Sequence, residues 1–459
     1  MMKGALPSIL DAVGHTPIVK LQKVARHVKS EIYVKCEYLN PAGSMKDRVA
    51  INIVDDAERR GLLRPGGTII EATSGNTGMG LAMVAAVRGY QCIFVMPDKM
   101  SQEKIASLRG FGAKVVICPT AVEPEDPRSY YSTSRRIVEE TPDAFYANQY
   151  HNPANPEAHY ASTAPEVWEQ TGGDFDVFAA GMGTGGTLSG CARYFKERKP
   201  GIKILGVDPI GSLYYEYVKT GRLTKPFSYY VEGIGEDFLP STMNLAALDE
   251  IVRVDDKECF LMTRRLTREE GLFVGGSCGA AVAGAIKYAE ATGMNEKILI
   301  LLPDGASKYL SKIFNDEWMR QNGFLDAPDP LGVVADLLAR HPGRKLITAR
   351  RGDTIRKVIG MLKEHGISQV PVLDGDRMVG LLAEVDLLNT LVKAESKLDD
   401  AIDTLVESDY ATVTPSTRVV LLRNIFNDAK LVVVQEGDAV SGIITKIDLI
   451  EYLAERRVA

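Results

Sequence analysis

Cysteine is scarce in this sequence, with six residues in 459 and no two of them spaced as C-x-x-C. Thiolate zinc sites use closely spaced cysteine pairs, and small secreted scaffolds use dense disulfides, so both classes are excluded. Histidine is equally scarce, and His151 and His159 lie eight residues apart with two prolines between them. We therefore expect no metal site, and a reducing cytoplasm as the location of the protein.

Long apolar runs and an excess of basic residues are also missing. No segment approaches the roughly 20 apolar residues that span a bilayer, and the first 17 residues contain no continuous apolar region typical of a secretory signal. Lysine and arginine number 54 against 60 aspartates and glutamates, a net charge of −6. Nucleic acids and membrane surfaces are polyanionic, so neither is an expected partner.

The sequence does contain short β-branched runs that alternate with helical stretches over its first 320 residues. The expected strands contain 68–70, 92–95, 115–117, 177–178, 204–207 and 298–301, and the expected helices span 47–60, 77–88 and 101–110. Nearly all-apolar strands that alternate with helices predict an α/β fold with parallel-rich sheets covered on both faces. Ligands of such sheets bind where strands end and helices begin.

An internal repeat follows a segment rich in proline and aspartate. Residues 370–391 and 432–453 align at an offset of 62, so that Gly380 matches Gly442 and Asp386 matches Asp448. Each copy predicts a strand, a turn, a strand and a helix, and two copies indicate a paired α+β module rather than a solenoid. We expect a first domain at 1–323, a linker at 324–332, and modules at 333–396 and 397–459.

The motif NPAGSMKDR places Lys46 in the first turn of a predicted helix that Ser44 can cap. The positive end of the helix dipole disfavours an ammonium there and favours the neutral amine, which attacks an aldehyde to form a Schiff base. Lysines are mostly exposed, so a solvated surface lysine is the alternative interpretation from this motif alone.

The motif EATSGNTGMG follows one strand and opens a helix. Backbone N–H groups at a helix start bind anions, and Thr73, Ser74 and Thr77 add hydroxyls while Asn76 adds an amide. This pocket suits a carboxylate, although a glycine-rich turn without a ligand explains the pattern about as well.

The motif GMGTGGTLSG, residues 181–190, allows two interpretations. Gly181, Gly183 and Gly186 fit the dinucleotide fingerprint, and Asp208 follows at the end of the next strand. Alternatively the loop holds a single phosphate with backbone amides and with threonine hydroxyls. The cradle is favoured, because the fingerprint usually occupies the first βα unit of its domain.

The motif GGSCG, residues 275–279, opens a further helix. Ser277 is either an N-cap or a hydroxyl facing a heteroaromatic nitrogen, and Cys278 is expected to serve packing because no histidine partner is evident.

In this order, NPAGSMKDR, TSGNTG, GTGGT, VEGIGEDF (231–238) and GGSCG resemble pyridoxal-phosphate enzymes of the β-synthase type, fold type II. The likeness covers residues 5–323, and the repeat resembles tandem CBS domains, a Bateman module. Together they resemble the cystathionine β-synthase family. The resemblance implies that Lys46 forms the Schiff base, Asn76 meets the cofactor's 3′-oxygen and Ser277 meets its pyridine nitrogen. It also implies a set of phosphate-binding residues: Gly183, Thr184, Gly185, Gly186 and Thr187.

For the substrate, the resemblance implies a carboxylate site and a second set of residues: Thr73, Ser74, Asn76, Thr77, Gln149, Tyr160 and Gly233. Tyr150 and Glu232 are implied catalytic residues, with Glu232 receiving the ammonium group of homocysteine unless it is a solvated loop acid. The implied reaction is β-replacement on L-serine by L-homocysteine to give L-cystathionine. A CBS-domain cysteine synthase using O-acetylserine and sulfide, and a ligand sensor with an idle synthase-like domain, are the alternatives.

Vertebrate members of the family that this chain resembles carry a haem-binding extension at the amino terminus. This chain begins close to the catalytic motifs, so we expect no haem. In the second module, Gly442 to Asp448 fits the adenosyl-binding pattern of CBS domains through Thr445 and Asp448, whereas Ala383 replaces the hydroxyl residue in the first. The resemblance thus implies one site for S-adenosylmethionine or an adenine nucleotide, unless the module only holds subunits together. We expect a homodimer or higher homo-oligomer.

Overall fold

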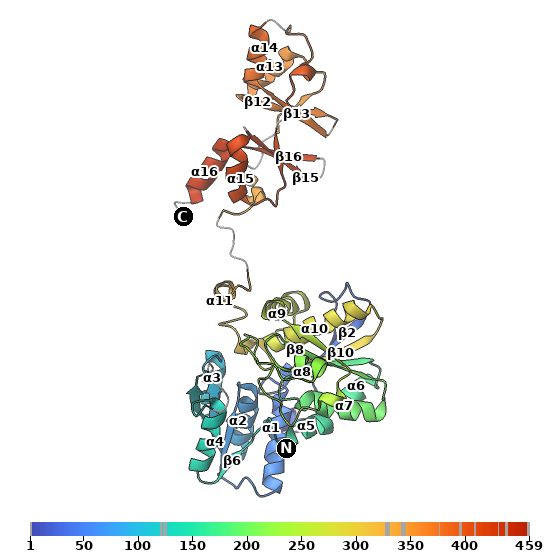
Figure 1. The fold of residues 1–459 in the computed structure, drawn as a ribbon, viewed down its shortest axis with the longest axis vertical. Helices are drawn as coiled ribbons and strands as arrows, with labels where there is room; N and C mark the ends of the chain where they lie inside the picture. The colour runs from blue at the N-terminus through green and yellow to red at the C-terminus, as the bar shows by residue number, and fades with distance from the viewer. Residues whose placement is uncertain are drawn as a thin grey trace. The chain divides into compact units, whose positions relative to one another are not determined.

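The structure is a computed structural model that describes residues 2–119, 122, 126–325, 331–340, 346–375, 377–393, 397–407, 410–429, 431–436 and 439–456. The chain divides into two compact units, Met1–Asp326 and Ala327–Ala459 (Figure 1). Phe324, in the expected linker, is buried against Tyr230, Phe260 and Trp318, and residues 326–330 of that linker lie outside the described residues.

The larger sheet of the first unit is parallel except at its edge. Its strand order is β1-β2-β10-β7-β8-β9, and among the described strands of this sheet β1 alone pairs antiparallel. The strands are β1 (Ile18–Lys20), β2 (Glu31–Cys36), β10 (Lys297–Leu302), β7 (Val177–Gly181), β8 (Lys203–Pro209) and β9 (Glu250–Val254). The helices are α5 (Ala154–Ala158), α6 (Ala164–Thr171), α7 (Gly186–Arg198), α8 (Tyr214–Thr220), α9 (Asp256–Glu270), α10 (Gly276–Thr292) and α11 (Asp316–Gln321).

Both faces of this sheet are covered, as the apolar strands predicted. Along β10, Ile298 and Ile300 pack into one core with residues of α10, while Leu299 and Leu301 pack into another with residues of α7. Successive residues of a strand point to opposite faces, so one uninterrupted apolar run supplies two cores.

The smaller sheet has the order β5-β4-β3-β6 and is entirely parallel in the described residues. It contains β3 (Thr68–Ala72), β4 (Gln91–Pro97), β5 (Lys114–Cys118) and β6 (Ala144–Tyr146), with α1 (Lys46–Arg59), α2 (Asn76–Arg88), α3 (Gln102–Gly110) and α4 (Tyr130–Glu140). Helices α1 and α2 pack so closely that a Cβ on Gly80 would lie 2.8 Å from the Lys46 carbonyl oxygen.

The second unit repeats one arrangement twice. Sheet β11-β12-β13 and sheet β14-β15-β16 each join a parallel pair to an antiparallel pair. The first copy contains β11 (Ala349–Arg350), α13 (Ile355–His365), β12 (Gln369–Asp374), β13 (Arg377–Ala383) and α14 (Glu384–Val392). Helix α12 (Val334–Leu338) precedes it in the chain, but Val334 and Leu337 pack into the core of the second copy. The second contains β14 (Ala411–Val413), α15 (Val419–Asp428), β15 (Leu431–Glu436), β16 (Ala439–Thr445) and α16 (Lys446–Arg456).

Short helical turns complete the described elements: η1 (Ile9–Ala12), η2 (Glu37–Leu39), the π-helix η3 (His159–Thr163), η4 (Leu245–Ala247), η5 (Ala306–Lys308) and η6 (Ile402–Leu405). No helix of the described residues has both the length and the apolar character that crossing a membrane requires.

Candidate active site

Lys46 lies at the start of α1, and its backbone N–H donates to Ser44 Oγ at 3.2 Å. Ser44 forms a β-bridge with Asp304, which follows β10, so the end of the large sheet lies beside this turn. The Lys46 side chain is buried, which lowers the pKa of its amine to about 8 against the opposing effect of the Asp304 and Glu236 carboxylates. The surface-lysine interpretation is therefore wrong.

The glycine loop 183–187 joins β7 to α7 and approaches its neighbours closely. Gly185 has φ of +85°, and a Cβ on Gly186 would lie 1.9 Å from Asn155 Oδ1. Asn155 Nδ2 donates to Thr184 Oγ1 at 3.0 Å, and Thr187 Oγ1 lies 3.1 Å from Nε2 of the buried His159. Two threonine hydroxyls therefore converge on the N-terminus of a 13-residue helix, an arrangement that suits a phosphate.

The dinucleotide alternative fails at its acidic residue. Asp208 is fully buried, its Oδ2 accepts from the Tyr215 N–H at 2.9 Å, and burial raises the pKa of the carboxyl to about 7. A ribose needs an accessible ionised carboxylate at this place, so the single-phosphate cradle is the better interpretation.

The loop between β3 and α2 presents the donors expected of a carboxylate site. Thr73 Oγ1 accepts from the Gly75 N–H at 3.0 Å, and Gly75 has φ of +124°. Thr77 Oγ1 donates to Gln149 Oε1 at 2.5 Å, so Gln149 joins the loop although 72 residues separate it from Thr77. Ser74 is half-buried in the same loop.

Asn76 is held by two groups that the motifs did not indicate. Its Nδ2 donates to Asp304 Oδ2 at 2.9 Å, and its Oδ1 accepts from Lys308 Nζ at 2.8 Å. The Tyr309 hydroxyl also donates to Asp304 Oδ2, at 2.6 Å. Asp304 and Lys308 follow an apolar strand without a recognisable pattern of their own, and only the sheet pairing brings them to the site.

Ser277 is not a cap, because α10 begins at Gly276 and its N-cap is Gly275. The side chain is 2% exposed and makes no hydrogen bond within the described part of the chain, so its hydroxyl is available to a ligand. Cys278 Sγ donates to the Asp304 carbonyl at 3.2 Å, and burial raises the pKa of this thiol well above its usual value. A protonated, buried thiol agrees with a packing role for Cys278.

Glu232 lies in a buried ion cluster rather than in solvent. Its Oε2 lies 2.7 Å from Lys104 Nζ and its Oε1 lies 2.7 Å from Lys312 Nζ. Both carboxylate oxygens are therefore paired, which leaves less free negative charge for a substrate ammonium than the sequence suggested. The alternative of a solvated loop acid is wrong, because Glu232 is 6% exposed.

The loop that carries Glu232 lies against the glycine loop. Gly235 N–H donates to the Met182 carbonyl at 2.6 Å, and a Cβ on Gly183 would lie 2.9 Å from the carbonyl oxygen of Gly233. Tyr150 is buried under the same loop, with its ring centroid 5.2 Å from that of Phe238.

Tyr160 is placed apart from these groups. Its hydroxyl donates to Glu197 Oε2 at 2.8 Å, and the Arg193 guanidinium lies 3.7 Å from its ring centroid. Both partners lie on α7, and these contacts orient Tyr160 in this structure. The substrate role that the resemblance implies for Tyr160 stays a prediction.

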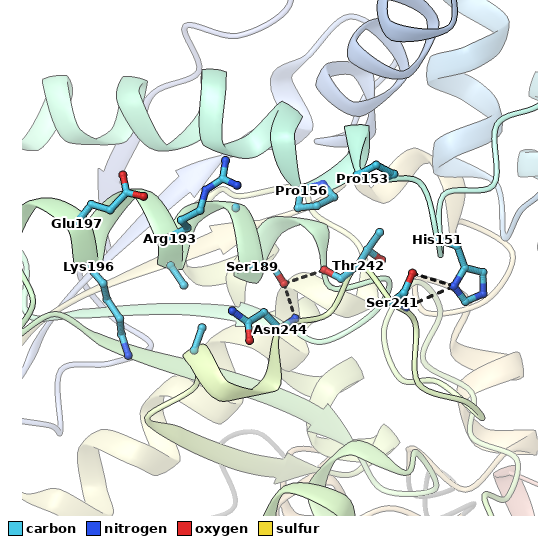
Figure 2. Close-up of a pocket in the computed structure, with 13 residues that line it drawn as sticks. His151, Pro153, Pro156, Ser189, Arg193, Lys196, Glu197, Ser241, Thr242 and Asn244 are labelled. Atoms are coloured by element: carbon cyan, nitrogen blue, oxygen red, sulfur yellow. Dashed lines mark hydrogen bonds between the residues drawn. The ribbon is translucent and has the colours of Figure 1, made fainter. Parts of the chain in front are cut away.

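A cavity of about 780 Å³ lies between α7, which contributes Ser189, Arg193 and Glu197, and the segments that contain His151 and Thr242 (Figure 2). Ser189 Oγ donates to the Thr242 carbonyl and accepts from the Asn244 N–H, both at 2.8 Å. Thr242 Oγ1 in turn donates to the Thr184 carbonyl at 2.5 Å. Hydrogen bonds between side chains and the main chain therefore hold the glycine loop and α7 against the segment 242–244.

Pyridoxal phosphate fits the groups described above. A buried lysine with a lowered pKa can form an imine, a glycine loop at a helix N-terminus can hold a phosphate, and a buried neutral hydroxyl can meet a ring nitrogen. Lys46, residues 183–187 and Ser277 supply these three features from α1, α7 and α10.

Comparison with known proteins gives the same family. Residues 9–304 match the family described as pyridoxal-phosphate dependent enzyme, and residues 334–393 and 391–455 each match the CBS domain. The chain is 37% identical to cystathionine beta-synthase of Dictyostelium discoideum, over 98% of this chain and 92% of the relative. It is 33% identical to that of Saccharomyces cerevisiae, over 97% of this chain and 98% of the relative.

The solved structure of the O-acetylserine dependent cystathionine beta-synthase from Helicobacter pylori is similar with a TM-score of 0.62 and 38% identity, covering 68% of this chain and 99% of that one. The likeness in sequence thus extends over both units, and the likeness in structure covers the catalytic fold. The chain belongs to the cystathionine β-synthase family of pyridoxal-phosphate-dependent enzymes.

Proposed function

We propose that this enzyme catalyses β-replacement on L-serine by L-homocysteine to give L-cystathionine. The observation that carries the proposal is the buried Lys46 amine, with its pKa lowered to about 8, beside a glycine cradle and a hydroxyl-lined loop. The likeness to cystathionine β-synthases over both units of the chain supports the same reaction.

The residues divide the work between binding and proton transfer. When bound, pyridoxal phosphate supplies the electron sink that stabilises negative charge at the substrate Cα. The hydroxyls of Thr73, Ser74 and Thr77, with Gln149, hold the substrate carboxylate. The Lys46 amine removes the Cα proton and later returns one to the same carbon.

Ser277 affects which reaction is favoured. A serine hydroxyl at a ring nitrogen does not hold that nitrogen protonated as a buried carboxylate would, and the electron sink is accordingly weaker. Loss or replacement of a group at Cβ is thereby favoured over transamination.

The substrate pair is the point to test, because a structural relative is named as O-acetylserine dependent. Mass spectrometry of products from L-serine or O-acetylserine, each with L-homocysteine or sulfide, distinguishes the activities. Cystathionine from serine and homocysteine supports the proposal, whereas cysteine from O-acetylserine and sulfide alone would identify a cysteine synthase. A protein that binds pyridoxal phosphate but converts no pair would indicate an idle synthase-like domain.

The second unit is proposed to bind an adenosyl ligand, S-adenosylmethionine or an adenine nucleotide, at Thr445 and Asp448. Thr445 Oγ1 donates to Asp448 Oδ2 at 2.6 Å, so the two expected ligand groups already lie together at the start of α16. The alternative role, holding subunits together, predicts no response of thermal stability or activity to S-adenosylmethionine.

We further propose a homo-oligomer, a dimer or larger, located in the cytoplasm. Closed two-fold assemblies are the commonest homo-oligomers, and a reducing compartment suits a chain whose six cysteines are all free. Sedimentation equilibrium of the full chain measures the oligomeric state directly.

A further inference from the structure

Glu236 is fixed by its backbone in the loop that covers the glycine cradle. The Glu236 N–H donates to Ser212 Oγ at 3.1 Å, and its carbonyl accepts from the Leu213 N–H at 3.2 Å. Gly233 and Gly235 on the same loop have φ of +85° and +78°, conformations that most other residues rarely adopt. The place of Glu236 is therefore set by the fold and not by its side chain.

The Glu236 side chain is 9% exposed, and its carboxyl makes no hydrogen bond within the described residues. Its loop lies against the glycine loop, because the Gly235 N–H donates to the Met182 carbonyl at 2.6 Å. The negative charge of Glu236 also acts to raise the pKa of the Lys46 amine, in agreement with a place at the same site. The other groups that face it are Lys99 after β4, Asp208 at the end of β8, Asp237 on its own loop, Tyr130 and Tyr131 of α4, Tyr150 after β6, Tyr214 of α8, and Tyr229. Burial and the neighbouring Asp237 raise the pKa of the Glu236 carboxyl well above its usual value, against the effect of the two lysines.

The reaction has an unfilled role for such a group. The β-hydroxyl of serine departs as hydroxide unless a proton reaches its oxygen, and hydroxide is a poor leaving group. Lys46 becomes an ammonium when it removes the Cα proton, and that proton is needed again at Cα after the thiol has added. A second donor for the departing oxygen therefore leaves Lys46 free for this last step. The Tyr150 phenol is a far weaker acid, because burial raises the pKa of this tyrosine well above its usual value. A carboxylic acid is the stronger donor.

We propose that Glu236 is a catalytic residue that protonates the departing β-oxygen and then deprotonates the incoming thiol. This inference rests on the proposed use of serine. Lys46 takes the Cα proton, the Cβ–O bond breaks as the Glu236 carboxyl gives its proton to that oxygen, and water leaves. The Glu236 carboxylate then takes the proton of the thiol, sulfur bonds to Cβ, and the Lys46 ammonium returns a proton to Cα. Both groups end as they began.

The test compares two amino acids that differ in their leaving group, in the full-length enzyme loaded with pyridoxal phosphate. β-Chloro-L-alanine releases chloride, which needs no proton, whereas L-serine releases hydroxide or water. Adding serine changes the absorption of the bound cofactor, and the rate of this change is measured. We expect E236Q to lower that rate by about 10²-fold or more, the usual contribution of a general acid. The change produced by β-chloro-L-alanine should stay within about threefold of wild type.

Asp208→Asn is the matched control, because it also converts a buried carboxyl to an amide. It should slow the reactions with L-serine and β-chloro-L-alanine equally, or leave both unchanged. Equal slowing of both by E236Q would overturn the assignment of Glu236. A wild-type enzyme that processes β-chloro-L-alanine but not serine would overturn the proposed substrate and this inference together. The two failures are therefore distinguishable.

A measurement on the protein without cofactor tests the protonation of Glu236 independently of turnover. The infrared difference between wild type and E236Q at pH 8 should contain the carbonyl band of a protonated carboxylic acid. At this pH Asp208, with a pKa raised to about 7, is mostly ionised and contributes little. A difference spectrum with carboxylate bands alone would contradict the proposal.

Discussion

Lys312 Nζ lies 2.7 Å from Glu232 Oε1, and this ion pair joins the last segment of the catalytic unit to the loop over the site. Lys104 of α3 binds the other oxygen of Glu232, so three segments meet at one carboxylate. Lys104 is fully buried while the Lys312 side chain is 20% exposed. The Lys104 and Lys312 charges outnumber the single negative charge, so the carboxylate is needed to offset them.

Removing that carboxylate should therefore cost more than removing one lysine. We expect E232Q to lower the stability of the catalytic unit by about 3–5 kcal/mol, because it leaves the fully buried Lys104 ammonium and the mostly buried Lys312 ammonium without this counter-ion. K312M should cost less, since Lys104 still pairs with Glu232. Urea unfolding followed by the absorption of bound cofactor measures both variants, and equal losses would show that the pairs contribute independently.

The glycine cradle predicts a steric effect on cofactor binding. A Cβ on Gly186 would lie 1.9 Å from Asn155 Oδ1, and Asn155 also donates to Thr184 Oγ1. G186A should weaken binding of pyridoxal phosphate at least tenfold, which is about 1.4 kcal/mol. G201A is the control, because nothing lies within 4 Å of its added Cβ. Equilibrium dialysis of the apoenzyme gives both dissociation constants, and similar values would contradict the steric argument.

Lys46 predicts the pH dependence of cofactor uptake. The neutral amine attacks the aldehyde, and burial lowers the pKa of Lys46 to about 8, so the neutral form predominates above that pH. The rate at which apoenzyme forms the imine should rise with pH and reach half its maximum near pH 8. Stopped-flow absorption measures the rate, and circular dichroism verifies that the fold is intact over the same range. A midpoint near that of free lysine would show that the amine is solvated.

Much of this site was predictable, because short motifs hold the cofactor and sheet topology brings them together. Lys46, the glycine loop and Ser277 each open a helix after a strand or turn, and that position is legible in a single sequence. The alternation of apolar strands with helices likewise predicted the fold, and the 62-residue offset predicted the paired module, in which β12 and β15 begin 62 residues apart.

Long-range polar contacts were not predictable. Strand β2 has the sequence EIYVKC, and its charged residues made it hard to recognise as a buried strand. Its Lys35 is nevertheless fully buried beside Glu166 of α6. The partners of Glu232 lie 128 and 80 residues away, so its pairing depends on the tertiary fold. Tyr160 was assigned by resemblance, and its contacts with α7 set its orientation.

The repeated module offers an internal control for the adenosyl site. Asp448 Oδ2 accepts from the Thr445 N–H at 2.7 Å and from Thr445 Oγ1, while Asp386 Oδ2 accepts, within the described residues, from the Ala383 N–H alone, at 3.1 Å. Both aspartates cap a helix, but only the second module adds the hydroxyl. We expect calorimetry with S-adenosylmethionine to give one site per chain, which D448A abolishes and D386A leaves intact. Each variant removes an equivalent hydrogen bond at the start of a helix. A loss of helix stability alone would therefore weaken binding equally in D386A and D448A, whereas a contact between Asp448 and the ligand would weaken it in D448A only. Equal loss of binding in D386A and D448A would mean that the module needs both caps and that Thr445 and Asp448 have no special role.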